Sequence, residues 1–194
     1  NPYLSNTGRY SFIDERPGIK FERTFTQTLT NRFKKVLYAY AELREQFFFQ
    51  RNVSEKDFQN FRRNYATFLP KASLNYRNDQ FGDHEITYEI NYSTFSDYPT
   101  LSRLAPLVDS ANIFYFQRGN PNLKPSYKNE FGFWLSYISF VSSKVVDNFK
   151  VSIRAGVVNN AFADSTIYDQ AGRAENYTVN VNGSKYLTAN GEFQ

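Results

Sequence analysis

Residues able to carry out catalysis or to bind a metal are few in this chain. His84 is its one histidine, it lies beside Asp83, and there is no cysteine. A zinc site would therefore need carboxylates alone, and no serine stands in the glycine-flanked turn of a hydrolase nucleophile. Asp79 and Asp83 offer the oxygen ligands that calcium prefers, but their spacing lacks the rest of a binding loop. We expect no catalytic residue, no metal and no cofactor; a hydrolase that depends on His84 is the enzymatic alternative.

The long segment between residues 94 and 126 offers binding chemistry, because it combines charge with aromatic surface. We expect four of its side chains to face a ligand: Arg103, Tyr115, Phe116 and Arg118. A second set shapes the loop: Pro99, Gly119, Asn120, Pro121, Leu123, Lys124 and Pro125. Proline fixes its own φ and restricts the residue before it, so this segment should re-enter the fold stiff and extended. Rigid closure of the loop, without a ligand, is the alternative role for this second set.

Alternating side chains on both sides of this loop predict the strands that hold it. Tyr88, Ile90 and Tyr92 share one face and Glu89 and Asn91 the other, which is the period of two of a β-strand. The same pattern predicts eight strands, at residues 19–30, 33–50, 68–76, 85–93, 127–137, 149–157, 176–182 and 187–193. A helix is the alternative for residues 33–50, whose centre contains Ala and Leu. Residues 1–18, 51–63 and 161–174 are predicted to be loops.

The composition narrows the class of protein. The chain has 194 residues, a net charge of +4 and 19% aromatic residues, with a mean hydropathy of -0.60. No run approaches the roughly 18 apolar residues of a membrane helix, but a spanning β-barrel has polar lumenal residues that lower its average hydropathy. The Lys and Arg residues are scattered singly, which argues against a nucleic-acid partner. The absence of an initiator Met and of a signal peptide suggests a processed form or an excised piece.

The lengths of the connections favour a membrane barrel over a soluble β-sandwich. Connections near Asn31, Gln80, Ser143 and Ser184 are short, whereas those near Val53, Ala111 and Gln170 are long. Outer-membrane barrels have short periplasmic turns and long extracellular loops, with an apolar band about 25 Å tall. A sandwich would need a second sheet to cover that band. Charged residues at mid-strand on the polar faces suit a wet lumen, and rings near strand ends suit a membrane interface.

Several segments, taken in order, resemble TonB-dependent outer-membrane transporters of the branch common in Bacteroidetes. These segments are residues 68–76, 92–94, 98–101, 104–106 and 119–125, the last reading Gly-Asn-Pro-Asn-Leu-Lys-Pro. The resemblance implies a location in the bacterial outer membrane and energised uptake of a scarce nutrient through a plugged barrel. It also implies the partners: outer-membrane lipid, the remaining barrel strands and plug, the TonB energy-transducing complex, and a surface lipoprotein.

The chain departs from that family in two ways. It carries neither a plug domain nor an energy-coupling box, and it predicts eight strands where such transporters have about 22. We therefore interpret residues 1–194 as part of a single barrel domain. A complete eight-stranded barrel is the alternative within membranes, and a soluble ligand-binding β-sandwich is the alternative outside them. Iron chelates, cobalamin, oligosaccharides and peptides all pass through such transporters, and the sequence does not choose among them.

Overall fold

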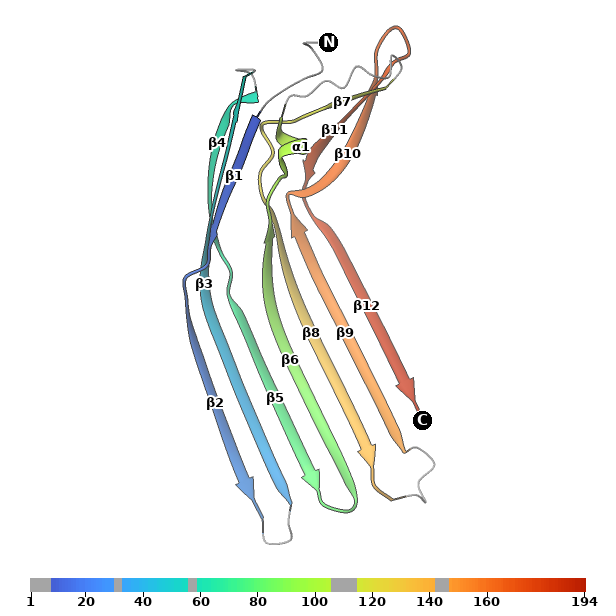
Figure 1. The fold of residues 1–194 in the computed structure, drawn as a ribbon. Coiled ribbons are helices and arrows are strands. Elements are labelled where there is room, and N and C mark those ends of the chain that lie inside the picture. Colours follow the sequence, from blue (N-terminus) through green and yellow to red (C-terminus); the bar gives the residue numbers. More distant parts are fainter. Residues whose placement is uncertain (1–7, 30–32, 56–58, 106–114, 142–146) are drawn as a thin grey trace.

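A computed structural model describes residues 8–29, 33–55, 59–105, 115–141 and 147–194. One antiparallel sheet dominates it, with its strands in the order β1-β3-β5-β6-β8-β9-β12, while β2 and β4 also pair with β3. The strands are β1 (Gly8–Glu15), β2 (Gly18–Thr28), β3 (Lys34–Ser54), β4 (Phe61–Phe68), β5 (Lys71–Gln80), β6 (His84–Asp97), β8 (Ser126–Ser139), β9 (Asn148–Asn159) and β12 (Ser184–Phe193). Figure 1 shows a curved, open sheet of long inclined strands.

The long strand β3 connects two levels of the sheet. Its first half pairs with β2 and β5, and its second half pairs with β1 and β4. The flanking strands are interrupted at Pro17 and at Pro70, since proline has no N–H to donate to a ladder. Backbone bonds bridge both interruptions: Glu45 N donates to the Pro17 carbonyl at 3.0 Å, and Leu69 N donates to the Arg44 carbonyl at 2.7 Å. β1 therefore continues into β2 as one bent strand, and β4 continues into β5 in the same way.

A smaller sheet lies beyond one end of the main sheet. It contains β10 (Ala161–Tyr168), β11 (Ala174–Val181) and β7 (Tyr115–Arg118) in the order β10-β11-β7, with β7 parallel to β11. The short helix α1 (Leu101–Leu104) lies at the same end (Figure 1). We call this the loop end and the opposite end the turn end. Within the described residues, no helix is long and apolar enough to cross a membrane.

Several connections differ from the sequence predictions. Residues 161–174 are predicted to be a loop, but 161–168 form β10 and continue β9 past Asn160, whose φ is +52°. The predicted short turn at 183–185 is instead the bend between β11 and β12, where Gly183 has a φ of +79°. The predicted strand at 176–182 forms, but it lies in the smaller sheet. Among the described residues, seven strands of the main sheet are therefore long enough to cross a membrane: β2, β3, β5, β6, β8, β9 and β12.

The predicted loops at 1–18 and 51–63 are also partly strand. Residues 8–15 form β1, β3 continues to Ser54, and β4 begins at Phe61. These strands carry alternating side chains, such as Tyr10 and Phe12 against Arg9 and Ser11. The turn residues around them outweighed that alternation in the sequence interpretation. The helix alternative for residues 33–50 is wrong, since the whole range from Lys34 is strand.

The two faces of the main sheet differ sharply in polarity. Along one hydrogen-bonded row the outward residues are Leu74, Ile90, Phe133 and Ile153. Nothing packs against this face among the described residues: Ile90 is 44% exposed and Phe131 is 49% exposed. Soluble monomers rarely expose an apolar surface of this extent. The opposite face is polar and partly buried, with Glu42, Thr87 and Ser136 all below 10% exposure. Such a surface suits a membrane barrel better than a soluble sandwich, whose second sheet would cover the apolar face.

Candidate functional site

The Gly119–Pro125 segment is fixed at the loop end by backbone contacts. Gly119 lies against Ala105, so close that an added Cβ would stand 1.5 Å from the Ala105 carbonyl oxygen. The next amide, Asn120 N–H, donates to the Arg103 carbonyl at 2.6 Å. Leu123 is 4% exposed and Leu104 is 2% exposed. The segment therefore needs glycine where it crosses the end of α1, and its contacts with Ala105 and with the Arg103 carbonyl hold it there.

Side-chain amides extend this attachment to the smaller sheet. The Asn120 Nδ2 donates to the Thr178 carbonyl of β11 at 3.0 Å. Asn180 Oδ1 accepts from the Lys124 amide at 2.8 Å, and its Nδ2 donates to the carbonyls of Lys124 and Asn160 at 3.0 and 2.8 Å. The Asn180 side chain thus ties the segment to the β9–β10 bend. These bonds hold the segment against the smaller sheet.

The structure describes the side chains of two of the four predicted ligand-facing residues, Arg103 and Arg118, and these contact different partners. The guanidinium of Arg103 lies 4.8 Å from the centre of the Phe162 ring on β10. Arg118 on β7 forms an ion pair with Glu175 of β11 at 3.1 Å and lines a cavity of about 370 Å³. Tyr115 and Phe116 lie on β7 by their backbone, and their side chains are outside the described structure. Among the predicted loop-shaping residues, Gly119, Asn120 and Pro121 also line this cavity.

A second cavity, which the sequence interpretation missed, lies on the inner face at the loop end. It has a volume of about 300 Å³ and is lined by Tyr10, Phe12, Asp14, Arg16, Gln46, Phe48, Ser96, Asp97, Tyr98, Pro99 and Thr100. We call it the aromatic cleft. Its residues come from β1 and the following Arg16, from the second half of β3, and from the end of β6 with the segment after it. Since residues 1–18 are predicted to be a loop, four of its eleven lining residues had no predicted position in a strand.

Stacked rings form the floor of the aromatic cleft. The rings of Phe48 and Tyr98 are parallel to within 6° at 4.3 Å, and Tyr65 lies 5.4 Å from Tyr98. Phe12, 6.0 Å from Phe48, remains 60% exposed and offers its face to solvent. Aromatic faces of this kind bind apolar ligand surfaces and the C–H faces of polar ones. Pro99, a predicted loop-shaping residue, lines the cleft and is fully buried.

Polar groups beside these rings could orient a ligand. The Arg16 guanidinium binds the Asp14 carboxylate, with Nη2 to Oδ2 at 2.5 Å, and Gln46 Nε2 donates to Asp14 Oδ1 at 2.8 Å. The Tyr10 hydroxyl donates to Gln50 Oε1 at 2.9 Å. Burial, with a smaller contribution from Tyr65 nearby, raises the pKa of the Tyr10 hydroxyl, so it remains a neutral donor at physiological pH.

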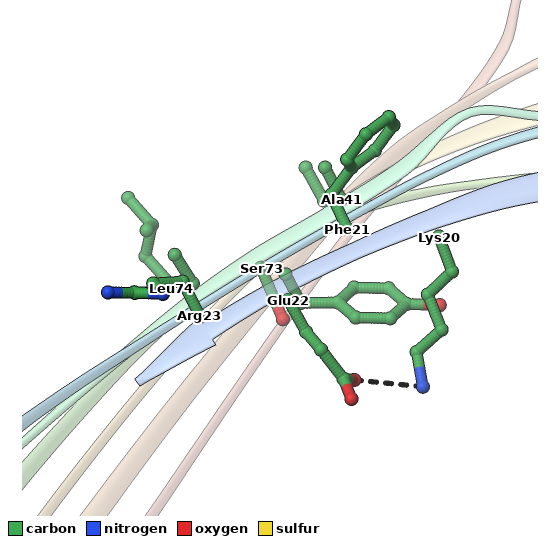
Figure 2. Close-up of a pocket in the computed structure, with 10 residues that line it drawn as sticks. Lys20, Phe21, Glu22, Arg23, Ala41, Ser73 and Leu74 are labelled. Atoms are coloured by element: carbon green, nitrogen blue, oxygen red, sulfur yellow. Dashed lines mark ion pairs between the residues drawn. The ribbon is translucent and has the colours of Figure 1, made fainter. Parts of the chain in front are cut away.

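The polar inner face continues from the cleft along the spanning strands. Its charges are mostly paired: Lys128 Nζ lies 2.7 Å from Glu130 Oε2, Arg77 lies 2.7 Å from Glu85, and Arg44 pairs with Glu42. Such a surface is suited to water rather than to lipid. A hollow of about 750 Å³ along β2, β3 and β5 is lined by residues from both faces of the sheet. In Figure 2, Phe21 and Ala41 point to one side, while Glu22 and Lys20 pair at 2.9 Å on the other.

The residues considered for catalysis lie at the turn end, away from both cavities. A ring nitrogen of His84 is 2.9 Å from the Asp83 carboxylate, and the His84 ring stacks on Tyr137 at 5.6 Å. Asp79 pairs with Arg77 at 3.5 Å. In the part of the chain that the structure describes, no three metal-binding side chains come together.

An apolar outer face, a polar inner face and strands long enough to cross a bilayer define a transmembrane β-barrel protein. Residues 28–194 match the outer membrane protein beta-barrel family, and the chain belongs to that family. No curated protein and no solved structure matches it. The protein is therefore located in the bacterial outer membrane, with its apolar face in lipid. By the family's architecture, the loop end is extracellular and the turn end periplasmic.

Proposed function

We propose that this chain is the barrel part of a TonB-dependent receptor of the Bacteroidetes type, which takes up a scarce nutrient by energised transport. In this proposal a plug closes the lumen, the TonB complex of the inner membrane drives its movement, and a surface lipoprotein assists capture. The chain itself catalyses no reaction. The ordered segments that resemble such transporters support this assignment, since residues 98–101 and 119–125 both lie at the extracellular end.

The observation that carries the proposal is the position of the aromatic cleft. Tyr10, Phe12 and Phe48 line a cavity on the inner face, directly above the polar surface that runs along the spanning strands. A receptor needs its ligand site at the outer mouth and a wet path below it. A barrel that serves only as an anchor needs neither feature. The rigid Gly119–Pro125 closure supports the same function, because it holds one wall of the mouth in place.

The edges of the sheet support a barrel larger than the described part. Among the described residues, β2 pairs only with β3, and β12 pairs only with β9. A strand edge in lipid leaves N–H and C=O groups unpaired, each at a cost of several kcal/mol. Further strands beside β2 and β12 would satisfy both edges. A small complete barrel, in which the β2 and β12 edges close on each other, is the second candidate.

Two measurements separate these candidates. The first is the mass of the native polypeptide in outer-membrane extracts: about 22.7 kDa would contradict the receptor and leave the small barrel. The second is capture of the purified native protein by the periplasmic domain of the host's TonB. A larger polypeptide that binds this domain is the result we expect. Failure to bind would refute energised uptake even if the mass were large.

The nutrient-binding residues can then be tested in a strain that lacks the chromosomal copy. Iron chelates, cobalamin, oligosaccharides and peptides are supplied singly as the limiting nutrient, and growth identifies the one that needs the receptor. Replacing Phe12 and Phe48 by Ala should then raise the concentration needed for half-maximal growth about tenfold or more, since stacking rings contribute about 0.5–1.5 kcal/mol each beyond their buried area. Replacing Arg103, Tyr115, Phe116 and Arg118 jointly by Ala tests the predicted loop residues in the same assay.

His84→Ala provides the matched control in that strain. Its ring lies at the turn end, so we expect it to leave growth unchanged. An equal loss in this variant and in the Phe12, Phe48 variant would indicate poor assembly rather than a binding role. Growth that survives both the cleft and the loop replacements would place the ligand elsewhere.

A further inference from the structure

Three arginines gather on the outward face at the extracellular end of β3. Outward residues alternate along these strands: Arg9 on β1, Arg51 on β3 and Arg62 on β4 are exposed, whereas their neighbours Asn52 and Gln50 are buried. Arg51 stands directly opposite Arg62 in the β3–β4 register, and Arg9 opposite Val53 one position further along that face. These side chains therefore point away from the lumen and the aromatic cleft.

This arrangement is unfavourable in the protein alone. Like charges directly opposite each other on neighbouring strands repel. Among the described residues none of the three arginines has an ion pair; Arg62 lies 5.1 Å from the centre of the Phe49 ring. Glu15 and Glu45 share the outward face, but Glu15 is paired with Phe47, four positions before Arg51, about 13 Å along the strand. Glu55 follows the end of β3, four positions after Arg51. None of these three carboxylates therefore stands beside the Arg51 and Arg62 pair.

The height of the arginines is set by the length of β3. Lys35, on the same outward face, lies near the periplasmic end of the strand, sixteen positions before Arg51. At about 3.3 Å per residue and a tilt near 40°, these two residues are separated by about 40 Å along the membrane normal. A bilayer with its headgroups is about 40–45 Å thick. Lys35 at the inner headgroups therefore places Arg51 and Arg62 at the outer headgroups.

We infer that Arg9, Arg51 and Arg62 bind the anionic headgroup of a glycolipid in the outer leaflet, through its phosphate groups. Arginine presents a planar fork of donors that matches phosphate oxygens, and two guanidinium groups from opposite positions can hold one phosphate between them. A bound phosphate removes the repulsion between Arg51 and Arg62. The exposed apolar residues Ile13 and Phe47 lie nearer the bilayer on the same face, where Glu15 stands opposite Phe47. This inference needs only the membrane location, and it stands independently of the uptake function.

The experiment uses the full native polypeptide, purified in a neutral detergent, and lipopolysaccharide from the host as the probe. Bound glycolipid is counted by native mass spectrometry. Since each basic residue near a membrane surface contributes about a factor of five to binding of anionic lipid, the Arg51→Gln, Arg62→Gln double variant should bind roughly 25-fold more weakly. Lys35→Gln is the matched control, since it removes one charge from the same face of the same strand at the other end. We expect it to bind lipopolysaccharide as tightly as the wild type.

Three further arms keep the test decisive. Dephosphorylated lipopolysaccharide should bind the wild type and the double variant equally weakly, and inorganic phosphate at the same concentration should not compete. Without glycolipid, the double variant should be no less stable than the wild type, because the substitution removes a repulsion. Unchanged binding in the double variant, equal binding of the dephosphorylated lipid, or competition by free phosphate would each overturn the inference. Loss of an acidic protein partner with glycolipid binding unchanged would overturn it as well.

Discussion

Gly119→Ala should detach the extracellular closing segment while leaving the spanning strands intact. An alanine Cβ at this position would lie 1.5 Å from the Ala105 carbonyl oxygen and 2.2 Å from its carbonyl carbon. Both atoms are backbone, so no side-chain rotation relieves the clash. A separation of at least 3.0 Å requires a displacement of about 1.5 Å. The Asn120 to Arg103 hydrogen bond, now 2.6 Å, would then exceed the limit of a hydrogen bond.

The expected magnitude follows from the bonds that this displacement removes. The Asn120 amide, the Asn120 side chain to Thr178 and the Lys124 amide to Asn180 are lost together. At about 1 kcal/mol each, the local opening free energy falls by about 3 kcal/mol, which is roughly a hundredfold in exchange rate. Hydrogen–deuterium exchange on the purified protein measures this directly, in peptides that cover residues 101–105 and 119–125.

A matched control is available in Gly8→Ala. An added Cβ at Gly8 would meet its nearest atom, the Val53 carbonyl oxygen, at 3.5 Å, which is ordinary contact. We expect its exchange pattern to equal that of the wild type. Unchanged exchange at residues 119–125 in Gly119→Ala would refute the argument that this glycine is required by close backbone approach. Faster exchange throughout the spanning strands would show that the segment supports the whole barrel instead.

Two other predictions concern the lipid-facing surface and the extracellular hairpin. Leu74→Arg, on the outward face, should lower the free energy of unfolding in lipid vesicles by about 2–4 kcal/mol. Ser73→Arg, on the inner face, should change this free energy little. Equal losses in the two variants would contradict the assignment of the faces. The backbone amide of Arg173 lowers the pKa of Asp169, so this turn is stabilised above the ordinary carboxyl pKa and weakens as pH falls through the lowered value. The assay is the rate of pepsin cleavage at the neighbouring Tyr168, measured at each pH for the wild type and for Asp169→Asn. As the solution is acidified, the wild-type rate should rise toward the rate of the variant. A ratio of the two rates that does not change with pH would refute the linkage.

The spanning strands were predictable because lipid imposes one rule on all of them. Outward positions in the hydrocarbon favour apolar side chains, so Tyr88, Ile90, Phe131 and Phe133 alternate with polar residues through the middle of their strands. The fold class and the membrane location follow from this alternation, and the family confirms both. The closing segment was recognisable for a different reason: two prolines and a glycine in seven residues leave few conformations for the backbone.

The extracellular sheet and the aromatic cleft were not predictable by the same rule. Outside the lipid both faces of a strand can be polar, so β10 and β11 carry residues such as Asp164 and Asn176 that are typical of loops. The junctions depend on tertiary contacts: Asn180 holds the β9–β10 bend from a distant part of the chain. The cleft joins β1 to the segment after β6, and no spacing in the sequence brings Phe12 to Tyr98.

The bends in the strands preserve the side-chain alternation, and this connects the cleft to the lumen. Even-numbered residues face inward in both β1 and β2, so Tyr10 and Phe12 lie on the same side of the sheet as Lys20 and Glu22. Odd-numbered residues face inward in both β4 and β5. A bulge of one extra residue at either proline would turn the cleft residues toward lipid. Each interruption instead spans two residues, which bends the strand without exchanging its faces. Insertion of a single residue beside Pro17 should therefore turn the Tyr10 and Phe12 rings to the outer face, at the level of the outer headgroups, while β2 remains in place. A rise in their accessibility to quenchers located in the headgroup region would test it.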